Sequence, residues 1–198
     1  MSGFTLLRAA DRCPQPWKNG GGITSDVLVH PPGADMESFD WRISLAEVGQ
    51  QGPFSAFPGV DRILTVIEGT LELEIDGARC RIDHGSPPHP FSGDASAYGW
   101  PGDGLVRDVN VMVRRAAGRA AVAREAVAAR AVLDVAPQTV LVVMALDALS
   151  ASVAGEDLAL QPLDALLMPE PGTLHLQAPG TARFLSVRLM AAETGKAS

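Results

Sequence analysis

The segment GPFSAFPGVDRILTVIEGTLELEIDG, residues 52–77, combines clear strand and turn signals. Apolar and β-branched residues fill positions 63–67, Glu68-Gly69 interrupts that run, and positions 71–75 then alternate strictly between apolar and acidic residues. Because successive side chains of a strand point to opposite faces, the second run predicts one buried and one solvent-facing side. Asp76-Gly77 follows directly and is a strong hairpin signal. The stretch therefore predicts two strands and a turn, for which an ordinary antiparallel hairpin is the simplest interpretation.

The composition is that of a globular chain with a sizeable core. Of 198 residues, 46% are hydrophobic, which suffices for one large domain or two small ones. The formal net charge of -7 argues against a nucleic-acid-binding surface, which needs a basic patch. Cys13 and Cys80 are too few for a disulfide scaffold, so we expect reduced thiols. No stretch resembles a membrane span or a signal peptide, and we therefore expect a cytoplasmic protein that binds neither membrane nor nucleic acid.

Short alternating or apolar runs bounded by turn-forming residues recur along the chain, and they predict an all-β fold with few or no helices. These runs are residues 4–7, 23–30, 39–47, 79–82, 105–114, 139–146, 158–160 and 182–190. Residues 116–130 stay ambiguous between helix and strand, because their many alanines favour a helix.

Three successive glycines, Gly20, Gly21 and Gly22, follow Trp17, Lys18 and Asn19. Glycine permits backbone conformations closed to other residues, and its N–H group can come close to an anion. The segment is not a P-loop, because the lysine precedes the glycines. A surface turn is the alternative, but a tryptophan and a lysine leading into the glycines favour a ligand contact.

The strand at residues 39–47 has two faces of different character. Trp41 lies on one face, whereas Arg42 and Ser44 lie on the other. Alternation alone leaves open which face lines a pocket and which meets solvent.

The strand at residues 105–114 carries Asp108, Asn110 and Met112 on one face. Polar side chains in a strand this apolar indicate an inward position in which they are hydrogen-bonded. A structural network between strands and contact with a ligand are equally compatible with that position.

The pattern of residues 52–77 is similar to the first motif of the cupins, small β-barrels that often hold a metal. Cupins usually place two His and one Glu as metal ligands just before the strand pair. In this chain the Glu position falls on Arg62, and the His positions fall near Ala56, Phe57 and Pro58. The resemblance therefore implies a cupin-like barrel without metal or other cofactor. Arg62 would place a fixed positive charge where the metal would lie, which suits an anion.

Four blocks go beyond a general cupin and closely resemble the HutD/Ves family over most of residues 15–115. In order, they are WKNGGG at 17–22, DWRIS at 40–44, the segment 52–62, and VRDVNVM at 106–112. The resemblance implies a bicupin, with two cupin-like antiparallel β-barrels of jelly-roll type in one chain. We expect an N-terminal barrel at residues 1–115 and a degenerate barrel at residues 116–198, with strand exchange between them left open.

The segment from Pro171 to His175 resembles the second cupin motif, in which the His binds metal. Its partners are missing here, because residues 140–155 contain no His. We therefore expect His175 to be structural rather than a metal ligand.

The family resemblance implies a role in bacterial histidine utilisation, by binding a pathway intermediate such as formylglutamate or urocanate and limiting flux. A metal-free binding protein for a small carboxylate is accordingly favoured over an enzyme. The alternative is a cofactor-independent isomerase or hydrolase acting on a small organic acid, with Asp94, Asp108 and His89 as candidate acid and base. An interaction module without a small ligand is a third alternative, and long edge strands leave a homodimer open.

We expect the ligand site at the mouth of the first barrel, with no catalytic and no metal-binding residue. Arg62 would pair with a carboxylate, the glycine segment would add anion affinity, and polar and aromatic side chains would complete the pocket. The expected ligand-binding residues are Trp17, Lys18, Asn19, Gly20, Gly21, Gly22, Thr24, Trp41, Arg42, Ser44, Phe54, Arg62, Phe91, Asp94, Asp108 and Asn110.

Overall fold

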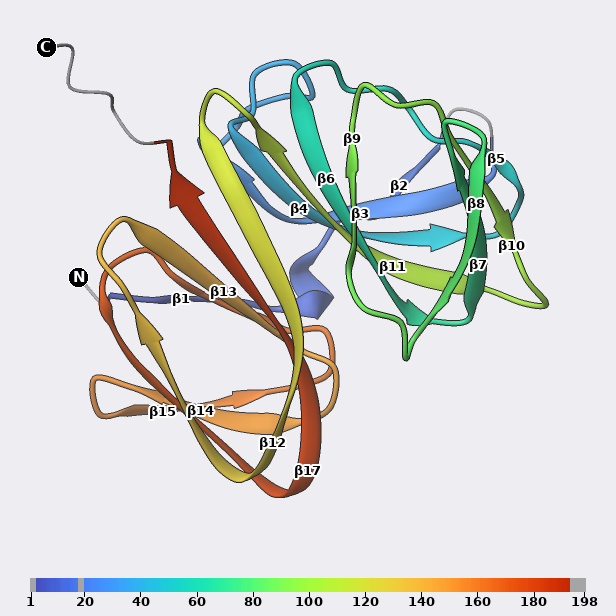
Figure 1. The fold of residues 1–198 in the computed structure, drawn as a ribbon. Coiled ribbons are helices and arrows are strands. Elements are labelled where there is room, and N and C mark those ends of the chain that lie inside the picture. The colour runs from blue at the N-terminus through green and yellow to red at the C-terminus, as the bar shows by residue number, and fades with distance from the viewer. Residues whose placement is uncertain (1–2, 18–19, 193–198) are drawn as a thin grey trace, which may run out of the picture. The chain divides into compact units, whose positions relative to one another are not determined.

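The computed structural model describes residues 3–17 and 20–192 (Figure 1). Strands dominate these residues, and the one helical element among them is the short 3-10 helix η1 (Ala9–Asp11). None of the described helical segments is long and apolar enough to cross a membrane. The predicted all-β fold class with few or no helices is therefore confirmed.

The chain divides into two compact units. We call residues 12–119 the central unit, and residues 1–11 together with 120–198 the terminal unit. The sequence placed residues 1–115 together instead. The difference arises because the first strand, β1 (Thr5–Leu7), pairs with β16 (Ala165–Met168), a strand from the far end of the chain.

The central unit consists of two antiparallel sheets. The larger sheet has the order β2-β3-β4-β11-β6-β9, and the smaller sheet has the order β5-β10-β7-β8. The strands of the larger sheet are β2 (Gln15–Pro16), β3 (Gly22–His30), β4 (Trp41–Val48), β6 (Val60–Glu68), β9 (His89–Ser92) and β11 (Val106–Arg114). Those of the smaller sheet are β5 (Gly52–Pro53), β7 (Thr70–Ile75), β8 (Ala78–Asp83) and β10 (Ala97–Pro101).

The two strands predicted within residues 52–77 exist, but they do not pair with each other as a simple hairpin would require. β6 pairs with β11 and β9, whereas β7 pairs with β10 and β8. Gly69 lies between them with φ of 77°, and a Cβ there would lie 2.6 Å from the Leu105 carbonyl oxygen. The chain thus passes from one sheet to the other at a position that only glycine fits well. The Asp76-Gly77 signal does mark a hairpin, the one between β7 and β8.

The core of the central unit lies between its two sheets. Leu64 and Val66 of β6 join Leu71 and Leu73 of β7 in one buried cluster, against which Phe54, Phe91 and Trp17 pack in part. The alternation that the sequence showed for β7 therefore does bury its apolar side. We call the side of the larger sheet that faces this cluster the inner face.

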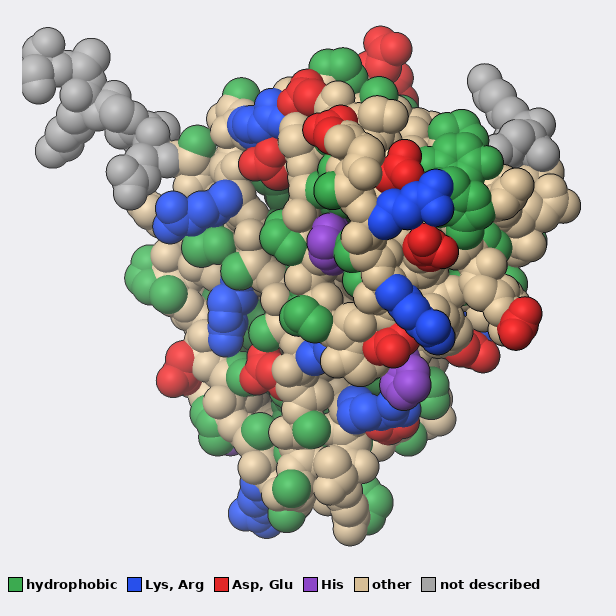
Figure 2. All heavy atoms as spheres, turned by 45° about the vertical axis from the view of Figure 1, so that its right-hand side comes forward, with side chains coloured by type: hydrophobic (Ala, Val, Ile, Leu, Met, Phe, Trp, Pro, Cys, Tyr) green, Lys and Arg blue, Asp and Glu red, His purple; other side chains and the backbone are tan. Residues whose placement is uncertain are grey.

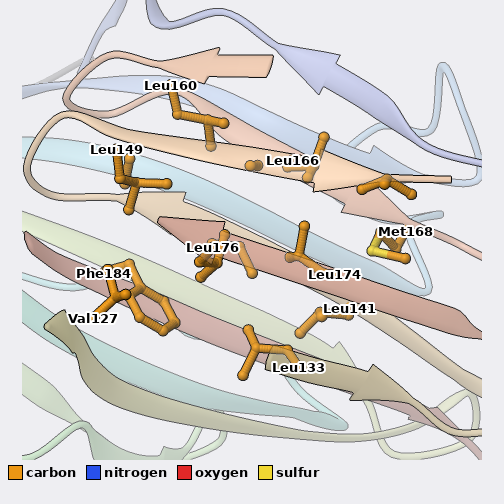
Figure 3. Close-up of a cluster of buried hydrophobic side chains, with 14 of the residues drawn as sticks. Val127, Leu133, Leu141, Leu149, Leu160, Leu166, Met168, Leu174, Leu176 and Phe184 are labelled. Atoms are coloured by element: carbon orange, nitrogen blue, oxygen red, sulfur yellow. The ribbon is translucent and has the colours of Figure 1, made fainter. Parts of the chain in front are cut away.

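The terminal unit is a seven-stranded antiparallel sheet: six strands have the order β1-β16-β13-β17-β14-β15, and the seventh, β12, pairs with β17. Its remaining strands are β12 (Gly118–Val135), β13 (Thr139–Ala145), β14 (Leu149–Val153), β15 (Glu156–Leu160) and β17 (Gly172–Ala191). Leucines, Val127, Met168 and Phe184 from these strands meet in one buried cluster (Figure 3). Of residues 116–130, left open between helix and strand, residues 118–130 belong to β12, because pairing and burial outweigh the helix preference of alanine.

Candidate functional site

Arg62 stands in a row of side chains on the inner face. Arg62 of β6 lies opposite Phe91 of β9 on one side and opposite Met112 of β11 on the other. Met112 in turn lies opposite Arg42 of β4. Directly opposed residues of antiparallel strands share a face, so these four side chains point to the same side of the sheet. The row therefore places two arginines on the inner face, one on each side of Met112.

Asn110 and Asp108 precede Met112 in β11 and lie on the same face. Asn110 lies opposite Ser44, and Asp108 lies opposite Ala46. The face of the 39–47 strand that points toward the interior is accordingly the one with Arg42 and Ser44. Trp41 points to the opposite side of the sheet, where its ring stacks on His30 with centroids 4.9 Å apart.

Arg62 is buried among aromatic rings. Only 3% of the residue is exposed. Its guanidinium carbon lies 4.9 Å from the ring centroid of Phe91, 5.4 Å from that of Phe57 and 5.5 Å from that of Phe54. Such contacts favour a cation electrostatically and fix the plane in which it lies.

The hydrogen bonding of Arg62 is sparse for a buried guanidinium. Nη1 donates to the Ser55 carbonyl oxygen at 3.0 Å. Nε is buried and has no partner among the described residues, and no ion pair to Arg62 is found there either. A guanidinium carries five N–H donors, so most of its capacity is unused. Burial lowers the pKa of Arg62 to about 10, against the opposing influence of Asp108, so the group is a cation at neutral pH.

Asp108 is the acid whose charge acts on Arg62. It is 1% exposed, and its Oδ2 has no hydrogen-bond partner in the part of the chain that the structure describes. Burial raises the pKa of Asp108 to about 7, while the positive charge of Arg62 acts in the opposite direction. Near neutral pH this carboxyl group therefore changes between a hydrogen-bond donor and an acceptor. Oδ1 of the neighbouring Asn110 is likewise buried without a partner.

Arg42 differs from Arg62 because it has a carboxylate partner, although its Nε, like that of Arg62, is buried without a hydrogen-bond partner among the described residues. Arg42 forms an ion pair with Asp26, and its Nη1 lies 3.3 Å from the Ser44 hydroxyl oxygen and 3.9 Å from the Met112 sulfur. Of the two arginines on the inner face, Arg62 is thus the one whose charge has no carboxylate in contact within residues 3–17 and 20–192.

The described residues of the glycine segment, Trp17 and 20–22, pack against the larger sheet. The Trp17 indole N–H donates to the Thr24 hydroxyl at 2.6 Å, and a Cβ on Gly22 would lie 3.1 Å from the Trp17 ring. The Gly20 N–H donates to the Trp17 carbonyl at 3.0 Å, so this amide is already occupied within the turn. Gly21 accepts from the amides of residues 49 and 50. Lys18 and Asn19, the other two expected contacts of this segment, lie outside the described residues.

Asp94 lies in a different environment from the inner-face residues. Its carboxylate accepts hydrogen bonds from the Gly59 N–H at 3.0 Å and the Ser92 hydroxyl at 2.9 Å, and it pairs with Arg115. Arg115 also binds Asp61 at 2.7 Å. These contacts, that of Arg115 first, lower the pKa of Asp94 to about 2. The network joins the turn before β6 to the turn after β9, and it occupies the carboxylate expected to meet a ligand.

Sequence reasoning did not include Phe57, Ser55 or Asp26 in the site. Phe57 and Ser55 belong to a loop, where no periodicity reports which side chains point inward. Asp26 lies beside a register shift in β3, which breaks the simple alternation of faces. Phe57 did have one signal, since it falls where cupins place a His ligand.

The side chains of Cys80 in β8 and His89 in β9 lie close to each other. The Cys80 sulfur lies 4.0 Å from Nε2 of His89, and burial raises the pKa of the Cys80 thiol. A raised pKa disfavours the nucleophilic thiolate. Within residues 3–17 and 20–192, no three His, Cys, Asp or Glu side chains are grouped so that they could hold one metal ion.

The surface shows charges of both signs mixed together. Figure 2 shows Lys and Arg beside Asp and Glu on the face it presents, without a broad area of one sign. Several of these charges form ion pairs, as Arg79 does with Glu72 and Glu74, and Arg107 with Glu47 and Glu68.

Comparison with known proteins places this fold and site in a family. The family model described as HutD matches residues 9–186. An uncharacterized 21.2 kDa protein in the hutC 3′ region of Pseudomonas putida is 38% identical over 120 residues, which is 57% of this chain and 59% of the relative. Protein Ves of Citrobacter koseri is 36% identical over 101 residues, 50% of this chain and 52% of Ves. The chain thus spans little more than half the length of the curated relatives it matches.

Solved structures extend the likeness over nearly the whole chain. A conserved protein of unknown function from Pseudomonas aeruginosa PAO1 has a TM-score of 0.87 and 30% identity, over 95% of this chain and 99% of that one. HutD from Pseudomonas fluorescens SBW25, solved in a formate condition, has a TM-score of 0.79 and 29% identity, over 96% and 99%. A cupin 2 conserved barrel domain protein from Leptotrichia buccalis shares the fold, with a TM-score of 0.61, 11% identity, and coverage of 94% and 100%. The family resemblance read from the four sequence blocks is therefore confirmed, and the chain belongs to the HutD family.

Proposed function

We propose that the central unit binds a small carboxylate through Arg62, without a metal. One observation carries the proposal: Arg62 is 3% exposed, yet it makes a single hydrogen bond within the described residues. Burying a charge is unfavourable unless it is paired and hydrogen-bonded. A ligand carboxylate would supply both, because its two oxygens match the planar fork of a guanidinium.

The surroundings of Arg62 support this function. The rings of Phe54, Phe57 and Phe91 hold the cation in one orientation, which reduces the entropy lost when a ligand binds. They also exclude water, so that an ion pair formed there is stronger than one at the surface. Asn110 and Asp108 on the same face offer polar atoms for a second group of the ligand.

The chemistry of the residues at the metal-ligand positions favours a metal-free site. Arg62, Ala56, Phe57 and Pro58 stand where a metal-binding cupin has Glu and His, and none of them is an ordinary metal ligand. The guanidinium of Arg62 would take over the role of positive centre that the metal has elsewhere.

We further propose that the ligand is an intermediate of histidine utilisation, such as formylglutamate or urocanate, and that binding limits flux in the cytoplasm. Membership of the HutD family and the relative in the hutC 3′ region support the pathway. Two separated carboxylates on formylglutamate, or a planar ring on urocanate, would suit a site of buried cation and aromatic walls. In this proposal the two units are the two cupin-like barrels of a bicupin, and a homodimer is compatible with their edge strands.

Asp108 favours a second candidate function, a cofactor-independent isomerase or hydrolase acting on a small acid. A group with a pKa raised to about 7, buried beside a cation, has the protonation behaviour of a general acid or base at neutral pH. Replacing Asp108 by Asn would then abolish product formation from the acid that binds. Under the binding function there is no product to lose.

Isothermal titration calorimetry on chelator-treated protein tests the proposal, with formate, acetate, glutarate, formylglutamate and urocanate as ligands. We expect at least one of them to bind, and Arg62→Gln to weaken it at least about tenfold, because hydrogen bonds to a charged group contribute about 1.5–3 kcal/mol. Arg79→Gln is the matched control, since Arg79 is exposed and pairs with Glu72 and Glu74. Equal affinity in Arg62→Gln and wild type would contradict the proposal, as would binding that returns only when a metal is added.

A further inference from the structure

The terminal unit contains a hollow of about 740 Å³ that the proposed function does not use. Its volume lies within the range of small-molecule sites, about 300–1,000 Å³. Strands β12, β14, β15 and β17 line it, and its polar side chains are those of Arg130, Ser150, Ser152, Asp157, His175 and Gln177. His175, which the second cupin motif singled out, is therefore exposed in this hollow rather than packed as a structural histidine.

The strand registers bring the polar side chains of the hollow onto one face. Asp157 lies opposite Ser152, and Ser152 lies opposite His175. In the neighbouring row, Ser150 lies opposite Gln177. Residues between these positions, such as Leu174 and Leu176, point to the buried core on the other face. The hollow is thus a polar surface on the outer side of the sheet.

Arg130 and Asp157 lie at opposite sides of this surface. β12 pairs with β17 on the side away from β14, and the Thr173 hydroxyl donates to the Asp134 carboxylate across that pair at 3.1 Å. Arg130 of β12 and Gln177 of β17 both line the hollow. Three strand spacings then separate β12 from β15, about 14 Å between their backbones. An arginine reaching inward from one side and an aspartate from the other leave space for a molecule of a few heavy atoms.

The six polar side chains of the hollow have free hydrogen-bonding capacity. Among the described residues, no side-chain hydrogen bond or ion pair involves Arg130, Ser150, Ser152, Asp157, His175 or Gln177. Elsewhere on this unit Arg183 is paired, through a bidentate contact with Asp147 at 2.8 and 2.9 Å. A cation and an anion left unpaired at opposite sides of one hollow complement a molecule that carries both charges.

We infer that the hollow binds a small zwitterion of the amino-acid type. Arg130 and Gln177 receive its carboxylate, Asp157 receives its ammonium group, and the hydroxyls of Ser150 and Ser152 form the floor between them. His175 adds a further donor or acceptor beside the ligand. This site is separate from Arg62 and does not depend on the function proposed for the central unit.

The test is an NMR titration of the ¹⁵N-labelled full chain with the standard amino acids, up to 10 mM each. The best binder is compared with its N-acetyl form, which lacks the ammonium group, and with its amide, which lacks the carboxylate. We expect shifts of the Ser150, Ser152 and Gln177 amides on titration. Each blocked form should bind at least tenfold more weakly, and so should Arg130→Gln and Asp157→Asn with the unblocked amino acid.

The controls separate this site from its neighbours. Glu156→Gln, next to Asp157 but outside the hollow, should leave affinity unchanged, and so should Arg79→Gln at an exposed position of the central unit. The inference is overturned if no amino acid shifts these amides up to 10 mM, if blocking either charge leaves affinity intact, or if the shifts lie elsewhere. Because the variants change exposed side chains, their amide spectra should otherwise match wild type, which shows that a loss of binding is not a loss of folding.

Discussion

Replacing Asp108 by Asn should change how stability depends on pH. Burial raises the pKa of Asp108 to about 7, from 3.8 for a free aspartate. The folded protein therefore holds this proton more tightly than the unfolded chain does. The free energy of unfolding decreases at a pH where the folded protein has to release the proton. The contribution of Asp108 is most favourable below about pH 4 and is lost as pH rises through about 7. Asparagine has no proton to lose, so the variant should lack this dependence.

The size of the effect follows from the pKa difference. A rise of about three units at about 1.36 kcal/mol each gives about 4 kcal/mol as the largest change in the free energy of unfolding. Part of the denatured ensemble stays compact, which makes the observed change smaller. Asp108→Asn should accordingly become more stable relative to wild type as pH rises from 4 to 8. Arg62, whose pKa is lowered only to about 10, stays protonated throughout this range, so it does not supply the pH dependence.

The assay is urea unfolding of wild type and variant at half-unit steps of pH. The quantity of interest is the difference in the free energy of unfolding between the two proteins, because other titrating groups cancel in it. Asp103→Asn, at an exposed position, controls for the exchange of carboxylate for amide. A difference that stays constant from pH 4 to 8 would refute the reasoning, since it would mean that Asp108 binds its proton equally in the folded and unfolded states.

Two further predictions concern the framework of the central unit. Gly69→Ala should lower the free energy of unfolding by more than Gly77→Ala in urea melts: both glycines have positive φ, but only at Gly69 would the added Cβ meet a carbonyl oxygen, at 2.6 Å. Equal losses in the two variants would contradict the close approach. Asp94→Asn should lower stability at pH 7 and lose this effect as pH falls below about 4 toward 2, because Arg115 lowers the pKa of Asp94 to about 2 in the folded state. An acid-unfolding curve followed by circular dichroism measures this, and a loss that persists unchanged at pH 2 would argue against it.

Local patterns in the sequence predicted the strands, but they could not predict the pairing of distant strands. The alternation in β7 and the Asp76-Gly77 turn are local, and the structure contains both. The pairing of β6 with β11 and of β1 with β16 joins segments far apart along the chain. Which strand pairs with which is decided by burial of the whole sheet, so an apparent hairpin of β6 and β7 could not be excluded from the stretch alone.

Sequence reasoning identified the candidate site residues that lie in a motif or a strand. It did not identify those that lie in a loop. Arg62 was identified by its offset from Gly69, and Asp108 and Asn110 by polar residues in an apolar strand. The loop residues Ser55 and Phe57 follow no period, so their contacts with Arg62 appear only in three dimensions. The orientation of β4 needed its pairing with β11, because alternation assigns two faces without saying which one is inside.

The two inner-face arginines provide an internal comparison that bears on function. At Arg42 the chain neutralises a guanidinium with its own groups: the carboxylate of Asp26 pairs with it, and the Ser44 hydroxyl and the Met112 thioether lie beside it. Arg62, two strands away on the same face, receives aromatic rings and one carbonyl oxygen instead. If Arg62 served only stability, an apolar side chain of similar size would avoid the desolvation of a charge. Arg62→Met should therefore unfold at an equal or higher urea concentration while losing carboxylate binding, whereas Arg42→Met should lose stability because Asp26 is left without its partner.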